Sequence, residues 1–289
     1  DVAATTRVDA DTATGADGNI SINGVGGLPL GLINAGTGDV TLTSTGAITD
    51  AIAGTNIIGD TLTMSAANAI GPTFAINTDV TSITATAGTA SPSNAFEIYI
   101  NEANDIALAI GGLHTAGGNV RIDFNNGSFD GNGQTIETEG TGAGGSVQLY
   151  SFGGANSGNI TMNGGSILTR GADAVGVGNA GGFVEIYTDN GSVTVSDINT
   201  SGGDDTSSFV PGGSGGYINV IASDNGTVAE NFDVTLNGTL TSLGGTGSIN
   251  STGSFIQIIA DNNIVDGNGL TVNAETDDPS NGLFWSTTT

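Results

Sequence analysis

The sequence predicts an all-β solenoid, in which one short coil of strands is stacked many times along a single axis. Two observations lead to this prediction. Apolar or β-branched residues occupy every second position in short runs that Gly, Asn or Asp turns separate, which is the pattern of strands with one buried face. Similar runs recur along the whole chain at short intervals, which is the signature of a repeat array.

The most regular repeat lies in residues 181–203, with the sequence GGFVEIYTDNGSVTVSDINTSGG. It predicts three strands, at Phe183–Thr188, Ser192–Ser196 and Asp197–Thr200. The first strand recurs in GGNVRIDF, GGSVQLYS, GGYINVIA and TGSFIQII, the second in GNITMNG and FDVTLNG, and the third in GQTIETEG, GSILTRGA and GTLTSLGG. One coil of strand, turn, strand, turn and strand is therefore predicted, in a parallel β-helix.

The spacing of the repeats sets the expected boundaries. Residues 1–17 are weakly patterned, and we expect an entry segment or cap there. First-strand equivalents then lie 20 to 22 residues apart, at Ile20, Val40, Leu62 and Ile83. From Gly118 they lie 27 to 38 residues apart, at Val120, Val147, Val184, Ile218 and Ile256. We expect about ten coils over residues 18–272, and a C-terminal tail or cap at 273–289.

The longer repeats contain Gly-rich insertions. We expect these to lie mainly between the third strand of one coil and the first strand of the next, at residues 153–158, 171–180, 202–215 and 244–252. Insertions at one corner of successive coils project from one edge of a rod, and such an edge is a common place for a binding surface.

Composition limits the partners of the chain. Its formal net charge is -26, with three Arg, no Lys and no Cys among 289 residues. Such a surface repels phosphate groups, so nucleic acid and anionic membranes are poor partners, whereas cations and neutral sugars are better ones. The alternative is that the acidic residues simply keep a strand-rich protein soluble. No apolar run approaches 18 residues and no basic region precedes one, so we expect a mature, soluble form or a fragment, without membrane insertion.

Strand alternation predicts which side chains point outward from the first-strand sheet. The middle outward column is polar: Arg121, Gln148, Glu185, Asn219 and Gln257. The flanking columns become apolar and aromatic in later coils, and we predict a contact surface formed by Tyr150, Phe183, Tyr187, Tyr217, Ile221, Phe255 and Ile259, together with the tail residues Leu283, Phe284 and Trp285. The alternatives are that aromatic ladders only reinforce neighbouring strands, or that a chain terminus covers them.

Catalytic motifs are not evident in the sequence. His114 is the one histidine, thiol chemistry is excluded because Cys is missing, and no nucleophile elbow occurs. Glycoside hydrolysis needs two carboxylates on one outer sheet, and the aligned columns place Asp123 and Glu185 two coils apart, with no basic residue beside them except Arg121. We therefore predict no catalytic residues and no enzymatic activity, with a polysaccharide-active enzyme as the third alternative.

Acidic turns make Ca²⁺ a candidate ligand, and we predict no other cofactor. The candidate residues are Asp130, Asn132, Asp204, Asp205, Asp266 and Asn268. None of these turns has the spacing of an EF-hand or a nonapeptide calcium repeat, and Asp-Gly and Asn-Gly are also ordinary turn sequences.

The phrases GGxVxI, GxITMxxGxIxTxGG and GSVTVSDINTSGG resemble the β-helical shaft of filamentous-haemagglutinin-like large exoproteins. The resemblance covers most of residues 18–272, although the amino-terminal secretion module of that family is not recognisable in residues 1–17. It implies a right-handed parallel β-helix that is secreted to the cell surface or the medium, where it has an adhesive or matrix-building role.

We accordingly expect a non-enzymatic extracellular subunit with a structural or adhesive role. It would self-associate into a fibre or a biofilm matrix, either through the predicted contact surface or by stacking its ends. The first alternative is a monomeric adhesin module that binds carbohydrate, on a host or a neighbouring cell, through Tyr150, Tyr187 and the projecting loops.

Overall fold

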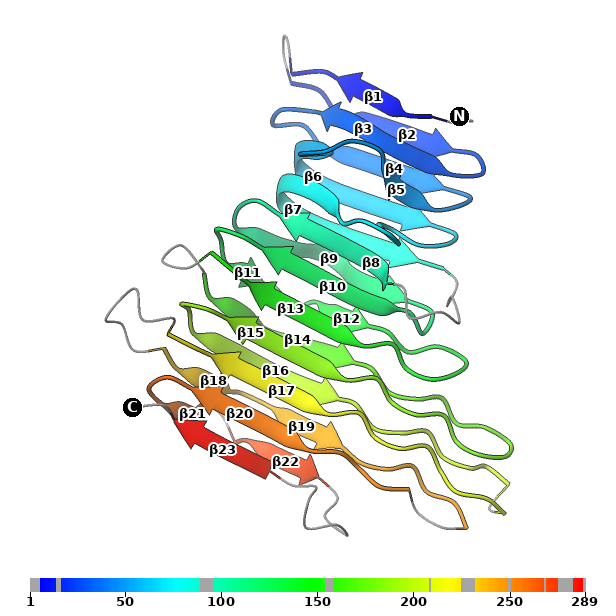
Figure 1. Ribbon diagram of the computed structural model, residues 1–289, viewed down its shortest axis with the longest axis vertical. Coiled ribbons are helices and arrows are strands. Elements are labelled where there is room, and N and C mark those ends of the chain that lie inside the picture. The colour runs from blue at the N-terminus through cyan, green and yellow to red at the C-terminus, as the bar shows by residue number, and fades with distance from the viewer. Residues whose placement is uncertain are drawn as a thin grey trace.

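The computed structural model describes residues 6–13, 17–88, 96–153, 158–207, 209–224, 232–248, 251–267, 269–274 and 283–287, with only the backbone described for Phe96 and 283–287. Within these ranges the chain is all-β: it contains 23 strands and no helix. No helix in the described ranges is therefore available to span a membrane. The strands lie in rows along the long axis, from the N-terminal end in blue to the C-terminal end in red (Figure 1).

The first-strand sheet is the most regular part. It contains β8 (Phe96–Glu102), β10 (Asn119–Phe124), β13 (Val147–Ser151), β15 (Val184–Thr188), β17 (Ile218–Ala222), β20 (Ile256–Ala260) and β23 (Leu283–Thr287). Consecutive members pair in parallel, and from β10 to β23 each residue lies opposite its counterpart without a shift. The predicted stacking of Val120, Val147, Val184, Ile218 and Ile256 is confirmed.

The other two strands of each later repeat also stack in parallel. They are β9 (Ile106–Thr115), β11 (Phe129–Asp130), β12 (Thr135–Glu137), β14 (Ile160–Leu168), β16 (Val193–Asn199), β18 (Val234–Leu236), β19 (Thr239–Ser242), β21 (Ile264–Asp266) and β22 (Thr271–Ala274). The predicted strands Ser192–Ser196 and Asp197–Thr200 are joined in one strand, β16. The large parallel sheet is compatible with a β-solenoid.

The N-terminal repeats are shorter. They contain β1 (Val8–Asp11), β2 (Ile20–Gly24), β3 (Leu28–Asn34), β4 (Val40–Ser44), β5 (Ile48–Asp50), β6 (Ile57–Ala66) and β7 (Ile76–Ala87). The predicted equivalents Ile20, Val40, Leu62 and Ile83 lie opposite one another. Residues 8–11, in the predicted entry segment, pair in parallel with β3, and residues 283–287, in the predicted tail, pair in parallel with β20.

The early and late first-strand series belong to different columns, so the expectation of one continuous first strand is wrong. Ile83 of β7 lies opposite Leu108 of β9, not over Val120. Val120 lies opposite Ile98, whose column continues through Ile70 and Ile48 to Leu28 of β3. Alternation marks the buried face of every strand equally, so it does not show which side of the coil a strand occupies.

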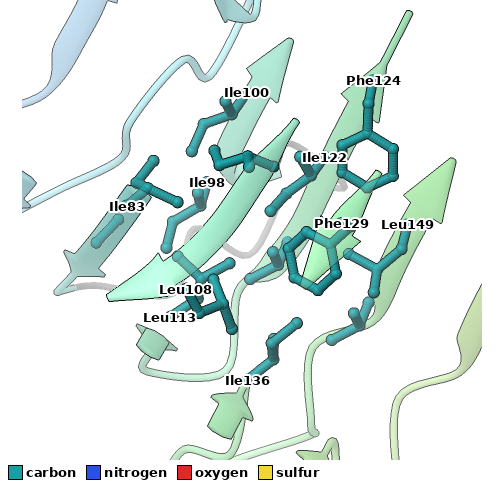
Figure 2. Packing of buried hydrophobic residues seen from close by; sticks show 14 of the residues in the cluster. Ile83, Ile98, Ile100, Leu108, Leu113, Ile122, Phe124, Phe129, Ile136 and Leu149 are labelled. Atoms are coloured by element: carbon teal, nitrogen blue, oxygen red, sulfur yellow. The ribbon is translucent and has the colours of Figure 1, made fainter. Parts of the chain in front are cut away.

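Inward-pointing aliphatic side chains fill the interior of the stack. Figure 2 shows a section of this core, where Ile98 and Ile100 from β8 face Leu108 and Leu113 from β9. Phe124 and Phe129 stack with their ring centroids 5.4 Å apart, and both are almost completely buried. This continuous burial is the main source of stability in a solenoid, because each coil covers the apolar surface of its neighbours.

The Gly-rich insertions form a layer of their own, which we call the Gly-rich slab. It consists of the described residues of 138–145, 169–182, 200–216 and 242–254, which project as long loops toward the lower right of Figure 1. The segment 153–158, expected at the same corner, instead follows β13, and only its first and last residues are described. That part of the corner prediction is wrong.

Backbone hydrogen bonds run in two directions through the Gly-rich slab. One set joins successive layers, as from Gly202 N to Leu243 O at 2.9 Å. A second set joins the outgoing and returning legs of a layer, as from Gly213 N to Gly203 O at 2.7 Å. A Cβ on Gly213 would lie 1.9 Å from the carbonyl oxygen of Asn179 in the neighbouring layer. The backbones of the two layers therefore approach to a distance that only glycine permits.

Buried threonines close the base of the slab layers 169–182 and 200–216. The hydroxyl of Thr169 donates to the carbonyl oxygen of Gly182 at 2.7 Å, and that of Thr200 donates to Gly216 at 2.6 Å. The glycine amides donate back to the carbonyl oxygens of the same threonines, each at 2.7 Å. These reciprocal bonds pair the two legs of a layer where they leave the core, so backbone and hydroxyl hydrogen bonds anchor the slab there.

Candidate contact surface

The predicted contact surface lies on the outward side of the first-strand sheet, which we call the first-strand face. The register confirms the middle column of Arg121, Gln148, Glu185, Asn219 and Gln257. It also confirms the flanking column of Asp123, Tyr150, Tyr187, Ile221 and Ile259. The side chains are therefore neighbours along the axis, about one strand spacing of 4.8 Å apart.

Glu185 is the centre of a polar network on this face. Its Oε1 accepts a hydrogen bond from the Tyr217 hydroxyl at 2.7 Å, and its Oε2 accepts from Gln148 Nε2 at 2.9 Å. The hydroxyl of Tyr150 also donates to Oε2. Burial raises the pKa of Glu185, but hydrogen bonds from Tyr150, Tyr217 and Gln148 outweigh it, so the pKa lies below its ordinary value.

Arg121 extends the network toward β8. Its Nε donates to Asp123 Oδ1 at 2.9 Å, and its guanidinium group lies over the rings of Tyr99 and Tyr150, 5.3 and 4.9 Å from the centroids. The Tyr99 hydroxyl donates to Asp123 at 3.1 Å. Cation–π contacts and an ion pair thus hold Arg121 flat on the sheet.

Three of the predicted contact residues form an aromatic stack. The ring centroids of Phe183 and Tyr217 are 4.7 Å apart and those of Tyr217 and Phe255 are 5.1 Å apart, with 4° between the ring planes in both pairs. Because the rings lie face to face, they cover one another and present their edges outward. This geometry favours the alternative that these rings reinforce the strands on which they lie.

Tyr150 and Tyr187 belong to a second aromatic group, whose third member, Phe152, was not among the predicted contact residues. Phe152 lies 5.4 Å from Tyr150 and 5.7 Å from Tyr187, with ring planes inclined at 46° and 41°. It is 37% exposed. The signal that could have found it is the Tyr150-x-Phe152 spacing, which continues the outward alternation past the end of β13.

The remaining predicted contact residues are placed less fully. Ile221 and Ile259 lie opposite one another, and both are partly buried. Leu283, Phe284 and Trp285 lie in β23 of the same chain, opposite Ile256, Gln257 and Ile258, but their side chains lie outside the described part of the structure. Their role as contacts stays a prediction.

The candidate calcium residues lie at three separate places: at the end of β11 and in the turn after it (Asp130, Asn132), in the Gly-rich slab (Asp204, Asp205), and at the end of β21 (Asp266). Asn268 lies outside the described residues. Asp130 accepts the amide of Asn132, which is the contact of an Asx turn, and Asp266 accepts the amides of Gly269 and Leu270, three and four residues further on. The described residues contain no group of three or more acidic, His or Cys side chains suited to a metal, and calcium binding stays a prediction.

Asp205 has a structural role in the Gly-rich slab. Its Oδ2 accepts the amides of Phe209 and Val210 at 2.8 and 2.9 Å, and its Oδ1 accepts the amide and hydroxyl of Ser207. Burial raises its pKa, but the hydrogen bonds from Ser207 and these amides outweigh burial and lower it strongly. This carboxylate therefore fixes the tip of the slab, where Phe209 is 85% exposed.

His114 lies away from the first-strand face, on β9. Its Nδ1 is 3.3 Å from Glu137 Oε2, and Nε2 contacts the carbonyl oxygen of Gly111. Both side chains of the pair are more than a third exposed. The pair is a surface contact between neighbouring strands, with no nucleophile among its contacts.

Comparisons of the chain with protein-family models, with curated proteins and with solved structures find no match.

The tyrosines give a direct test of the first-strand face. Burial and then the hydrogen bond to Asp189 raise the pKa of Tyr187 to about 12, and burial is also the largest cause of raised pKa values at Tyr99, Tyr150 and Tyr217. We expect tyrosinate absorbance in the folded protein to stay flat through roughly pH 10, the ordinary phenol pKa. In denaturant the phenols should ionise there. Absorbance at pH 10 that is equal in folded and denatured protein would contradict the network.

Proposed function

We propose that the chain is a non-enzymatic, secreted β-solenoid subunit that has structural or adhesive work at the cell surface. It resembles the shaft of filamentous-haemagglutinin-like exoproteins, and we propose their right-handed coil, with about ten coils of three short strands. Copies associate side by side into a fibre or a surface matrix. The parallel register from β10 to β23 supports a stiff rod, which displays one side-chain pattern over a long face.

The observation that carries this proposal is the exposed aromatic group around Phe152. Phe152 is 37% exposed, and its neighbours Tyr150 and Tyr187 are partly exposed and direct their hydroxyls to carboxylates. An exposed apolar group with a polar rim is typical of a contact between proteins. In the flanking Phe183–Tyr217–Phe255 stack, the rings already contact one another.

The chemistry of the carboxylates on the first-strand face supports a role without catalysis. A glycosidase needs a general acid with a raised pKa beside a second carboxylate. The pKa of Glu185 is lowered instead, and Asp123 is held by Arg121 and Tyr99. Both groups act as hydrogen-bond acceptors for the protein itself.

Removing the exposed aromatic group should reduce assembly. We expect the double variant Phe152→Ser, Tyr187→Ser to remain monomeric at concentrations where the wild-type chain forms larger species, because the apolar contact is lost while the stack of Phe183 is kept. Sedimentation velocity and electron microscopy measure the species. Assembly that is unchanged in this variant would refute the proposed contact.

Phe209→Ser is the matched control. Phe209 is also an exposed phenylalanine, but it lies at the tip of the Gly-rich slab rather than on the first-strand face. We expect this variant to assemble as the wild type does. An equal loss of assembly in both variants would indicate general apolar aggregation instead of a specific face.

A second candidate function is carbohydrate binding by a monomer. The inclined rings of Tyr150, Phe152 and Tyr187 favour it, because part of each ring face stays available for a sugar, and the amide of Gln148 lies beside them. A screen of neutral glycans, with and without Ca²⁺, tests this candidate. Binding that Phe152→Ser removes, by a chain that sediments as a monomer, would favour it over self-association.

A further inference from the structure

Two cavities lie at the corner of the coil that follows β5 and precedes β6 and β7. One has a volume of about 200 Å³ and is lined by Thr49, Asp50, Pro72, Thr73 and Phe74. The other has a volume of about 230 Å³, and four asparagines are among the residues that line it. Segments 49–55 and 72–78 contribute to both cavities, so we treat the two as one place, the corner site.

An exposed aromatic ring forms part of the corner site. Phe74 is 67% exposed and lies in the loop between Gly71 and β7. Gly71 has a φ of 69°, and a Cβ there would lie 2.5 Å from the carbonyl oxygen of Tyr99. The loop therefore begins with a sharp turn that requires glycine, and its ring lines a cavity instead of the core. An exposed ring beside a cavity offers a surface on which the C–H face of a sugar can pack.

A chain of side-chain amides lines the second cavity. Asn125 Nδ2 donates to Asn101 Oδ1 at 2.7 Å, and Asn101 Nδ2 donates to Asn77 Oδ1 at 2.8 Å. Each of these amide groups keeps one N–H free of the chain of bonds, because an amide nitrogen has two hydrogens. Asn126 adds an exposed amide, whose side chain has no hydrogen bond to the described part of the protein. The wall thus presents oriented donors and acceptors to a ligand.

Asp50 supplies a fixed acceptor in the first cavity. Its Oδ1 accepts the amide of Ile52 at 2.9 Å and Nδ2 of the fully buried Asn56 at 2.8 Å. Its Oδ2 accepts no hydrogen bond from the described residues. The carboxylate is therefore held in place by one oxygen, while the other can accept hydrogen bonds from the hydroxyls of a ligand.

The lining also determines which ligands do not fit. No basic side chain lines either cavity, and Asp50 is acidic, so an anionic ligand is repelled. A wholly apolar ligand would leave the asparagine amides without partners. The fitting ligand is neutral, rich in hydroxyl groups, and has one apolar face for Phe74.

We propose that the corner site binds a neutral oligosaccharide. One sugar ring packs on Phe74 with its hydroxyls directed to Asp50, and the next lies against the asparagine amides; each cavity has room for about one sugar ring. The ligand class is that of the second candidate function, but the corner site shares no residue with Tyr150, Phe152 and Tyr187. It is also independent of the proposed association between copies.

Calorimetric titration of the full chain with short neutral oligosaccharides of glucose, galactose and mannose tests the proposal. We expect the wild type to bind at least one of them. Phe74→Ala and Asn126→Ala should each weaken that binding by about tenfold, because each removes a ligand contact. Both side chains are exposed, so circular dichroism should show unchanged folding.

Phe152→Ser is the matched control, since it removes an exposed ring from the first-strand face, and it should bind the oligosaccharide as the wild type does. Binding that Phe152→Ser removes and Phe74→Ala keeps would overturn the corner site. So would a wild type that binds none of these sugars, or one that binds choline in their place, because a cation would then be the ligand of Phe74 and Asp50. Loss of larger species in sedimentation of Phe74→Ala would overturn it as well, since a second copy would then cover the site.

Discussion

Gly213→Ala is expected to destabilise the Gly-rich slab by about 3 kcal/mol, at the upper end of the range for overpacked sites. The new methyl carbon would lie 1.9 Å from the carbonyl oxygen of Asn179 and 2.3 Å from its carbon. Gly213 also donates to Gly203 O and accepts from Gly245 N, both at 2.7 Å, so its backbone cannot move away without losing these bonds. Urea unfolding and hydrogen exchange of residues 169–254 measure the loss.

The control for this prediction is Gly142→Ala in the same slab. Nothing lies within 4 Å of the position that its Cβ would take, so no displacement of a neighbouring chain is required. Alanine there should leave stability unchanged or raise it by a few tenths of a kcal/mol through the unfolded state. If Gly213→Ala were as mild as Gly142→Ala, the close approach of Gly213 to Asn179 in the neighbouring layer would be wrong.

A second large effect is expected from Glu102, whose side chain points into the core at the end of β8 and is completely buried. Its Oε2 accepts the Thr78 hydroxyl at 2.6 Å, and its Oε1 accepts the amide of Ala103 at 2.9 Å. Burial outweighs these bonds and raises the pKa of Glu102 from 4.5 to about 7.

This shift predicts that Glu102 makes the protein less stable as pH rises. Between pH 4.5 and about 7 the unfolded chain loses the proton while the folded chain keeps it. The free energy of unfolding therefore decreases over this range as the pH rises, and it stays constant above the folded-state pKa. The loss is roughly 3 kcal/mol. Glu102→Gln imitates the protonated acid, so this variant should equal the wild type near pH 4.5 and exceed it by that amount above pH 7. Unfolding midpoints across this range measure the difference.

Glu185→Gln provides the opposite control. The pKa of Glu185 is lowered, so its carboxylate contributes stability above the unfolded pKa, and this contribution is lost as the pH falls. As the pH rises, the wild type should therefore become more stable than Glu185→Gln. Over the same range it should become less stable than Glu102→Gln. The same sign for both variants would contradict the burial of Glu102.

Much of the first-strand face could be predicted from alternation alone. A side chain on a strand points in or out according to its position, so the columns that contain Gln148 and Tyr150 follow directly once the repeats are aligned. The buried Glu102 could also have been suspected, because it continues the inward series of Ile98 and Ile100. Its proton affinity depends on the hydrogen bonds around it, which alternation does not reveal.

The division of the aromatic residues into two groups was beyond the sequence pattern. Phe183 and Tyr187 are both outward residues near β15, yet one belongs to a closed stack and the other to an inclined, partly open group. Which arrangement forms depends on the rotamers of neighbouring strands and on partners such as Asp189, which accepts the Tyr187 hydroxyl at 2.6 Å.

By itself, the sequence determined an all-β chain of parallel repeats, because local alternation and turn residues specify short strands with one apolar face. The tertiary structure decided which strands share a column, as for Ile83 over Leu108, because the closure of each coil selects among strands with equivalent patterns. It also decided that the Gly-rich insertions form an ordered slab, because their order comes from backbone hydrogen bonds between distant segments.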